Sequence, residues 1–220
     1  MVGFHMFTPQ TWILITHLGN SVVLLSTAVI MAVWLQKGQA SLAAVSWLLI
    51  LGFAVLLVLA TKLAFLGWGV GIESIDFTGI SGHAMLSSAV LPTMAALLTF
   101  KLRPPFQVLA ITSGFVVAIV VGISRLVLDA HSESEVLIGW TLGCLVALAT
   151  LSVLRRVGSD FGNRTSPVPL ALALTAILAV TAPRGGQPGP ETHGLIVKMA
   201  LWASGRAAPF DRNMLHRQAS

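Results

Sequence analysis

Long apolar runs separated by short polar connectors dominate the chain. The runs cover residues 12–35, 42–61, 84–100, 106–123 and 136–154. Each is close to the ~17 to 25 residues that a helix needs to cross the hydrocarbon core of a bilayer. The pattern therefore predicts five transmembrane helices.

A sixth apolar run, at residues 168–182, reads VPLALALTAILAVTA. It is short, and Pro169 and Pro183 stand at its two ends. A run of this length can span a thin region of the membrane, re-enter it, or lie at its interface. We therefore predict an all-α polytopic membrane bundle with five to six transmembrane helices.

Composition supports a membrane protein and argues against a soluble domain and a cysteine-rich protein. The 220 residues are 55% hydrophobic and 10% charged, whereas soluble domains carry about 25% charge. The start, MVGFHMFTPQTW, has no Lys or Arg and no small-residue cleavage site, so we expect the first span to be retained. Cys144 is the one cysteine, which excludes an internal disulfide and a cysteine-rich metal site.

The distribution of basic residues predicts the orientation. Lys and Arg total 13 against 8 Asp and Glu, but no basic run is interleaved with aromatic residues, so we expect no nucleic-acid partner. No pattern indicates an obligate protein partner. The connectors at 36–41, 101–105 and 155–168 are basic, and short basic loops stay in the cytoplasm. The connectors at 62–83 and 124–135 would then face the periplasm of a bacterial inner membrane.

The chain divides into a membrane domain, residues 1–183, and a basic, partly amphipathic tail, residues 184–220. The segment RGGQPGPET at 184–192 is typical of an irregular linker. Beyond it, Leu195, Met199 and Trp202 recur at helical spacing. They predict an amphipathic helix that lies on the membrane or across the mouth of a site; an ordinary packing helix would show the same pattern.

Charged residues gather in the connector at 124–135. Arg125, Asp129, His131, Glu133 and Glu135 fall within eleven positions. Charge beside a bilayer is costly, so such a cluster indicates function. On a helix that begins near residue 130, His131 and Glu135 share one face, and the carboxylate can accept a hydrogen bond from the imidazole. That pairing suits a histidine nucleophile or base.

The other connector on this side adds complementary groups. Lys62 closes the second run, and Ser81, Gly82 and His83 stand directly before the third. Ser81 and Gly82 at a helix start would offer backbone N–H groups and the positive end of the helix dipole. Together with Arg125, these groups indicate a site for phosphate ester chemistry.

Two segments carry a specific resemblance. ISGH at 80–83 and SRLVLDAHSESE at 124–135 resemble the second and third motifs of the type 2 phosphatidic acid phosphatase (PAP2) superfamily, P-S-G-H and S-R-x5-H-x3-D. Lys62 is similar to the lysine of the first motif, K-x6-R-P. The resemblance implies a PAP2-like core and a metal-independent phosphatase that needs no cofactor and acts on a lipid phosphate among membrane lipids.

The same resemblance implies a role for each matching residue. His131 would be the nucleophile that forms a phosphohistidine, Glu135 would orient it, and His83 would protonate the leaving oxygen. The phosphoryl oxygens would be bound by four residues: Lys62, Ser81, Gly82 and Arg125.

The chain departs from the family pattern at three places. Gly69 and Val70 stand where the first motif has Arg-Pro, Ile80 replaces a proline, and Glu135 replaces an aspartate. The lost arginine removes one phosphate-binding cation. One hypothesis is that a tail arginine, Arg206 or Arg212, folds over the site and takes its place.

Two other functions stay open from the residues alone. The chain could bind or transport a lipid phosphate without cleaving it, which the missing Arg-Pro would explain. Alternatively, His83, His131 and Glu135 could hold a metal ion, although no metalloenzyme motif supports this.

Other charged residues and histidines receive no role. We interpret Glu73, Asp76, Asp129 and Glu133 as solvated loop charges, with Asp129 near enough to influence Arg125 or His131. Four histidines have no partner pattern: His5, His17, His193 and His216.

Overall fold

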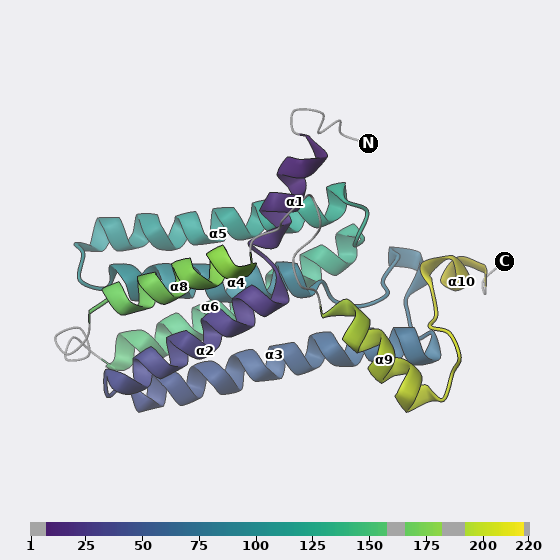
Figure 1. Cartoon of the computed structure of the whole chain (residues 1–220), viewed down its shortest axis with the longest axis horizontal. Coiled ribbons are helices and arrows are strands. Elements are labelled where there is room, and N and C mark those ends of the chain that lie inside the picture. The colour runs from purple at the N-terminus through teal and green to yellow at the C-terminus, as the bar shows by residue number, and fades with distance from the viewer. Residues whose placement is uncertain (1–7, 158–165, 182–191, 218–220) are drawn as a thin grey trace.

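The long helices of the chain lie side by side in one bundle (Figure 1). The computed structural model describes residues 8–157, 166–181 and 192–217. Within these ranges the helices are α1 (Pro9–His17), α2 (Ser21–Lys37), α3 (Ser41–Trp68), η1 (Glu73–Ile75), α4 (Gly82–Thr99), α5 (Pro104–Val127), α6 (Glu133–Val157), α8 (Val168–Thr181), α9 (His193–Ser204) and α10 (Arg212–Arg217). The predicted all-α bundle is confirmed.

Five segments of the described chain are long and apolar enough to cross a membrane. They are Pro9–Lys37, Ser41–Trp68, Gly82–Thr99, Pro104–Val127 and Glu133–Arg156. These segments correspond to the five predicted runs. The chain is therefore a multi-pass membrane protein.

The apolar pattern predicted one continuous helix over the first run, but the structure has two. α1 ends at His17, and α2 begins at Ser21 after a break. Asn20 caps α2 because its side-chain oxygen accepts hydrogen bonds from the backbone N–H groups of Val22 (2.9 Å) and Val23 (3.4 Å). The predicted run at 12–35 extended across this cap because the longer stretches before and after it are mainly apolar.

The second span continues past its predicted end at residue 61. α3 has 28 residues, so at 1.5 Å per residue it is about 42 Å long, against about 30 Å for a hydrocarbon core. Lys62 therefore lies within α3, not at its end. α3 stops at Gly69, which adopts a left-handed conformation with φ of 73°.

α4 is the helix around which its neighbours pack. It contacts α2, α3, α5 and α6, and most of its side chains are buried. Glycines on the neighbours allow close approach: a Cβ atom at Gly114 would lie 2.7 Å from Cα of Pro92, and one at Gly139 would lie 2.7 Å from the carbonyl oxygen of Ser81. Gly139 thus holds the first turns of α6 against the start of α4.

Replacing Gly139 with alanine should destabilise the bundle. The new methyl group would meet backbone atoms, which cannot rotate away, so we expect a loss of about 1–3 kcal/mol, as for other overpacked sites. Thermal unfolding in detergent would measure the loss. Gly52→Ala is the matched control because nothing lies within 4 Å of its Cβ position. Equal unfolding midpoints for the two variants would contradict this packing.

The described connectors fall at two opposite ends of the bundle. At one end, the indole N–H of Trp34 donates a hydrogen bond to the carbonyl oxygen of Ser166 (3.0 Å), and the ring of Trp34 packs against Phe100. At the other end, the backbone N–H of Thr78 donates to the Glu135 carboxylate (2.7 Å).

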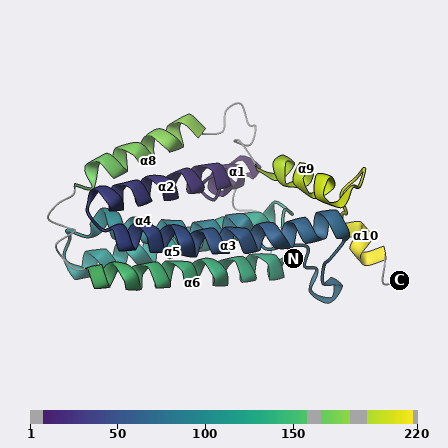
Figure 2. The same cartoon turned by 90° about the horizontal axis from the view of Figure 1, so that it is seen from below.

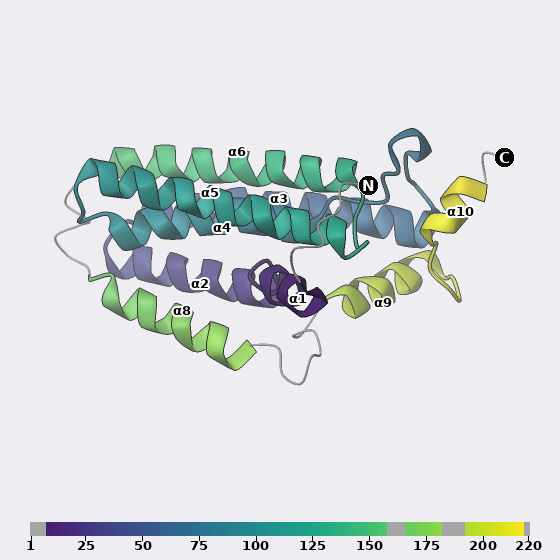
Figure 3. The same ribbon diagram turned by 90° about the horizontal axis from the view of Figure 1, so that it is seen from above.

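The described part of the sixth apolar run forms the helix α8. Its 14 residues are about 21 Å long, shorter than a hydrocarbon core. α8 lies against the outer side of α2 in both turned views (Figures 2 and 3). α8 begins at the end of the bundle where Ser166 lies beside Trp34, and it packs along α2.

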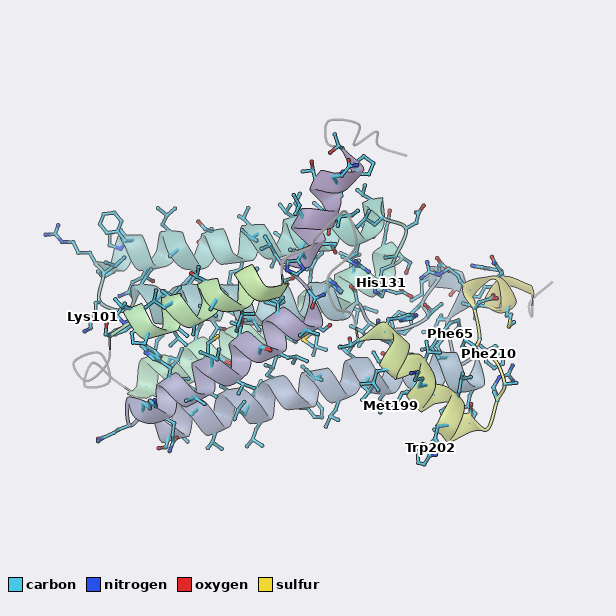
Figure 4. All side chains as sticks on the ribbon, in the orientation of Figure 1. Phe65, Lys101, His131, Met199, Trp202 and Phe210 are labelled. Atoms are coloured by element: carbon cyan, nitrogen blue, oxygen red, sulfur yellow. The ribbon has the colours of Figure 1, made fainter. Side chains whose placement is uncertain are left out.

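The described part of the tail forms two helices at the site end of the bundle. α9 packs on α3, where Gly67 allows Ala200 to approach, and α10 follows at the extreme end (Figure 2). The predicted domain boundary at 183/184 and most of the predicted linker lie outside the described residues. The predicted amphipathic helix is α9, on which Trp202 is 88% exposed and points away from the bundle (Figure 4).

Candidate active site

A cavity of about 540 Å³ lies where α3, α4 and α5 meet the tail. Its lining includes charged and imidazole side chains: Lys62, His83, Arg125, Asp129, His131, His193, Asp211 and Arg212. It also includes apolar side chains: Val58, Phe65, Leu66, Ile196 and Phe210. Figure 4 shows His131 at the bundle end of this region and Phe65 and Phe210 at the junction with the tail.

His131, which lines the cavity, forms a pair with Glu135. Nδ1 of His131 lies 2.6 Å from Oε2 of Glu135, whose side chain is 0% exposed. The carboxylate also accepts hydrogen bonds from the backbone N–H (2.7 Å) and hydroxyl (2.5 Å) of Thr78 and from the backbone N–H of Ser132 (3.2 Å). A buried carboxylate with this many donors is held in one position and stays charged.

The pairing was predicted, but its local structure was not. α6 begins at Glu133, so His131 lies just before the helix and Glu135 in its first turn. Asp129 has a positive φ of 50°, which turns the chain between α5 and α6. Nδ1 faces Glu135, and Nε2 is therefore the nitrogen available for chemistry at the cavity.

The surroundings of His131 favour its neutral form. Burial lowers the pKa of His131 below its ordinary value of 6.5, and the hydrogen bond with Glu135 opposes this. The positive charges of Lys62 and Arg125 lower the pKa further. An unprotonated imidazole at neutral pH is what a nucleophile requires.

Two cations come to the cavity from different helices. Lys62 lines it from α3, and Gly79, with φ of 146°, lets the connector pass close to the Lys62 side chain. Arg125 lies in the last turn of α5, and its Nη1 donates a hydrogen bond to the hydroxyl of Thr16 (2.8 Å). Thr16 is thus a positioning residue that no sequence motif indicated.

The start of α4 contributes a histidine and a helix terminus. His83 and Gly82 line the cavity, so the positive end of α4 faces it. Gly19, in the break between α1 and α2, lies against His83, since a Cβ atom there would be 3.2 Å from the ring.

Ser81 does not line the cavity. It is fully buried, its side chain caps α4 by accepting from the N–H of Ala84 (3.5 Å), and its own N–H donates to the Glu135 carbonyl oxygen (3.1 Å). Ser81 therefore positions α4 against α6.

The tail brings one of the two arginines considered above into the site. Nη2 of Arg212 lies 3.0 Å from Oε2 of Glu135, and Nη1 lies 2.9 Å from Oδ2 of Asp76. Arg206 does not reach the site, because its guanidinium stacks on the ring of Phe210 at 4.0 Å.

Two of the side chains interpreted as solvated loop charges have partners, and so does one histidine that received no role. Asp76 pairs with Arg212 and also with Nε2 of His216 (3.0 Å), while Glu73 lies 3.7 Å from Nδ1 of His216. The interpretation of Asp76 as merely solvated is therefore wrong, whereas Glu73 is exposed, as that interpretation expects. Their partners lie about 140 positions away in the sequence, so local spacing carried no signal.

Within the described ranges, no group of three His, Cys, Asp or Glu side chains is placed so that it could hold a metal ion. A metal site built from His83, His131 and Glu135 therefore has no matching ligand group there.

Comparison with known proteins agrees with the motifs. A family model described as "PAP2 superfamily" matches residues 68–159. An "Uncharacterized 22.5 kDa protein in cps region" of Klebsiella pneumoniae is 36% identical over 211 residues, which cover 96% of this chain and 100% of that protein. The chain belongs to the PAP2 superfamily. No solved structure matches it significantly.

Membership identifies the general chemistry, since PAP2 superfamily members are phosphatases. The matched region contains His83, Arg125, His131 and Glu135 but not Lys62 or Arg212. Those two cations enter the PAP2 cavity from α3 and from the tail, respectively.

Proposed function

We propose that the protein is a metal-independent phosphatase that hydrolyses a lipid phosphomonoester or pyrophosphate through a phosphohistidine at His131. The observation that carries the proposal is the 2.6 Å pairing of His131 with the buried Glu135 beside a cavity lined by cations. An oriented imidazole with a free Nε2 can attack phosphorus, and fixed positive charges stabilise the phosphoryl oxygens during transfer.

In the first step, the lone pair of His131 Nε2 forms a bond to phosphorus as the bond to the leaving oxygen breaks. Protonated His83 donates its proton to that oxygen, and the alcohol or phosphate leaves. His131 then carries the phosphoryl group on Nε2 and a proton on Nδ1, so its ring is positively charged. Glu135 stabilises this charge through the Nδ1 hydrogen bond.

In the second step, neutral His83 accepts a proton from a water molecule as the water oxygen attacks phosphorus. The P–N bond breaks, its electron pair returns to Nε2 of His131, and inorganic phosphate is released. Lys62, Arg125 and the N-terminus of α4 bind the phosphoryl oxygens in both steps.

A lipid substrate is supported by the apolar part of the cavity wall. Phe65, Leu66 and Phe210 line the same cavity as the cations, so one substrate molecule could present a phosphate and a hydrocarbon chain together. The proposal places Lys62 near the lipid headgroups, which the excess length of α3 over the thickness of a hydrocarbon core permits.

We propose further that the site faces the periplasm from a bacterial inner membrane. The basic connectors carry Lys37, Lys101 and Arg103 at the opposite end of the bundle, and such connectors stay in the cytoplasm.

The proposal predicts phosphate release from a lipid without a metal. Full-length protein in detergent with EDTA would be assayed against phosphatidic acid, phosphatidylglycerol phosphate and undecaprenyl pyrophosphate, and inorganic phosphate would be measured. We expect turnover of at least one lipid and a phosphoenzyme that is labile in acid and stable in base. Binding of these lipids without a phosphoenzyme would instead support a binding or transport protein, and a strict need for a metal would contradict the mechanism.

A further inference from the structure

The tail is attached to the site by contacts that differ in kind. The backbone N–H of Phe210 donates to the carbonyl oxygen of Leu66 (3.0 Å), and the Phe210 ring packs on Gly69, where a Cβ atom would be 2.9 Å from it. His216 then pairs with Asp76. Backbone, apolar and ionic contacts together fix the segment 206–216 beside the cavity.

These contacts place the side chain of Arg212 at the cavity. Its side chain is 35% exposed, and it reaches the carboxylate of Glu135, which is 0% exposed. Arg212 also lines the cavity, together with Lys62, Arg125 and His131. A residue 77 positions beyond Glu135 in the sequence is thus in direct contact with the carboxylate that orients the nucleophile.

The guanidinium keeps donors for a ligand. Arginine has five N–H donors in a planar fork. Three of them serve the contacts with Asp76 (2.9 Å), Thr78 (3.4 Å) and Glu135 (3.0 Å), which leaves two. Held by two carboxylates, the fork is already oriented, so less conformational entropy is lost when an anion binds.

We propose that Arg212 is a phosphate-binding residue of this site, so that the active site is completed by the tail and not by the bundle alone. The inference rests on the proposed function, in which the cavity binds phosphoryl oxygens. It assigns a role to a residue that lies outside the region matched by the family model. The ligand could be the phosphate of a lipid or free inorganic phosphate, which share the same chemistry.

Binding of inorganic phosphate tests the proposal independently of catalysis. The dissociation constant would be measured by titration calorimetry on the full chain in detergent. Arg212→Gln should weaken binding roughly 10- to 100-fold, the range expected for lost hydrogen bonds between charged groups. Arg212→Lys keeps the charge but lacks the fork, so it should recover part of the affinity. Lys198→Gln removes a positive charge from the exposed part of α9, away from the residues that line the cavity, and should change binding little.

The outcomes separate this inference from the proposed function. Equal phosphate affinity of wild type and Arg212→Gln, or no phosphate binding by wild type, would overturn the role of Arg212. A loss confined to Arg212 variants in a protein that hydrolyses no lipid phosphate would support the inference and refute the phosphatase. If the protein is active, KM for the lipid phosphate should rise in Arg212→Gln more than in Lys198→Gln, which separates lipid phosphate from free phosphate as the ligand.

Discussion

Replacing His131 with alanine should abolish phosphate release, with a loss of at least about 10⁴-fold in kcat, as for removal of other covalent nucleophiles. The reason is that Glu135 orients the His131 ring through Nδ1, and His131 lines the same cavity as Lys62 and Arg125. The measurements are turnover of a lipid phosphate and trapping of the phosphoenzyme, and both should be lost.

The unfolding midpoint of His131→Ala serves as the control. His131 is near the cavity surface, with a side chain 11% exposed, so its removal should leave the bundle folded. A phosphoenzyme that still forms in this variant would place the nucleophile elsewhere, with His83 the first residue to test.

Replacing Glu135 with glutamine should lower kcat by roughly 10²- to 10⁴-fold, as for loss of the carboxylate that orients a catalytic histidine. Glutamine has nearly the same shape but no charge. It can no longer stabilise the positive ring of a phosphorylated His131, and its amide group cannot accept all the hydrogen bonds now made to the two carboxylate oxygens.

The same variant should move the pH profile in a defined direction. Glu135 raises the pKa of His131 against the effect of burial, so its neutralisation should lower that pKa further. Protonation of His131 removes the nucleophile, and activity falls as pH drops through this pKa. The acidic limb of kcat/KM should therefore lie below the ordinary histidine value of 6.5 in wild type and at still lower pH in Glu135→Gln.

Glu133→Gln provides the matched control for this experiment. Glu133 lies in the same turn of α6 but is exposed. Its neutralisation should leave both the rate and the position of the acidic limb close to wild type. An equal shift in both variants would mean that a general charge effect, not the Nδ1 hydrogen bond, controls His131.

The tail changes how the PAP2 pattern applies to this chain. Gly69 stands where the first motif has arginine, and the structure uses it to end α3 and to admit the ring of Phe210. The departure from the motif and the attachment of the tail thus occur at the same position. A side chain at Gly69 would meet the ring that holds Arg212 near the site.

The sequence by itself determined the class of fold and the contact between His131 and Glu135 in the candidate site. Apolar runs of transmembrane length predict the helices. In lipid, a backbone N–H or C=O group without a hydrogen-bond partner is costly, and a helix provides these partners within each run. The i,i+4 spacing of His131 and Glu135 predicts their contact, although the structure makes it between a residue just before α6 and one in its first turn. Both predictions depend on residues that are close together in the sequence, so a single sequence is enough to make them.

Only the tertiary structure decided which distant groups complete the site. The pairs Thr16–Arg125, Thr78–Glu135 and Arg212–Glu135 join residues 109, 57 and 77 positions apart. The break at Asn20 and the extension of α3 past Lys62 likewise depend on a cap and on packing rather than on hydropathy. Such contacts form because helices from separate parts of the chain pack at one end of the bundle, and no periodicity along the sequence encodes that meeting.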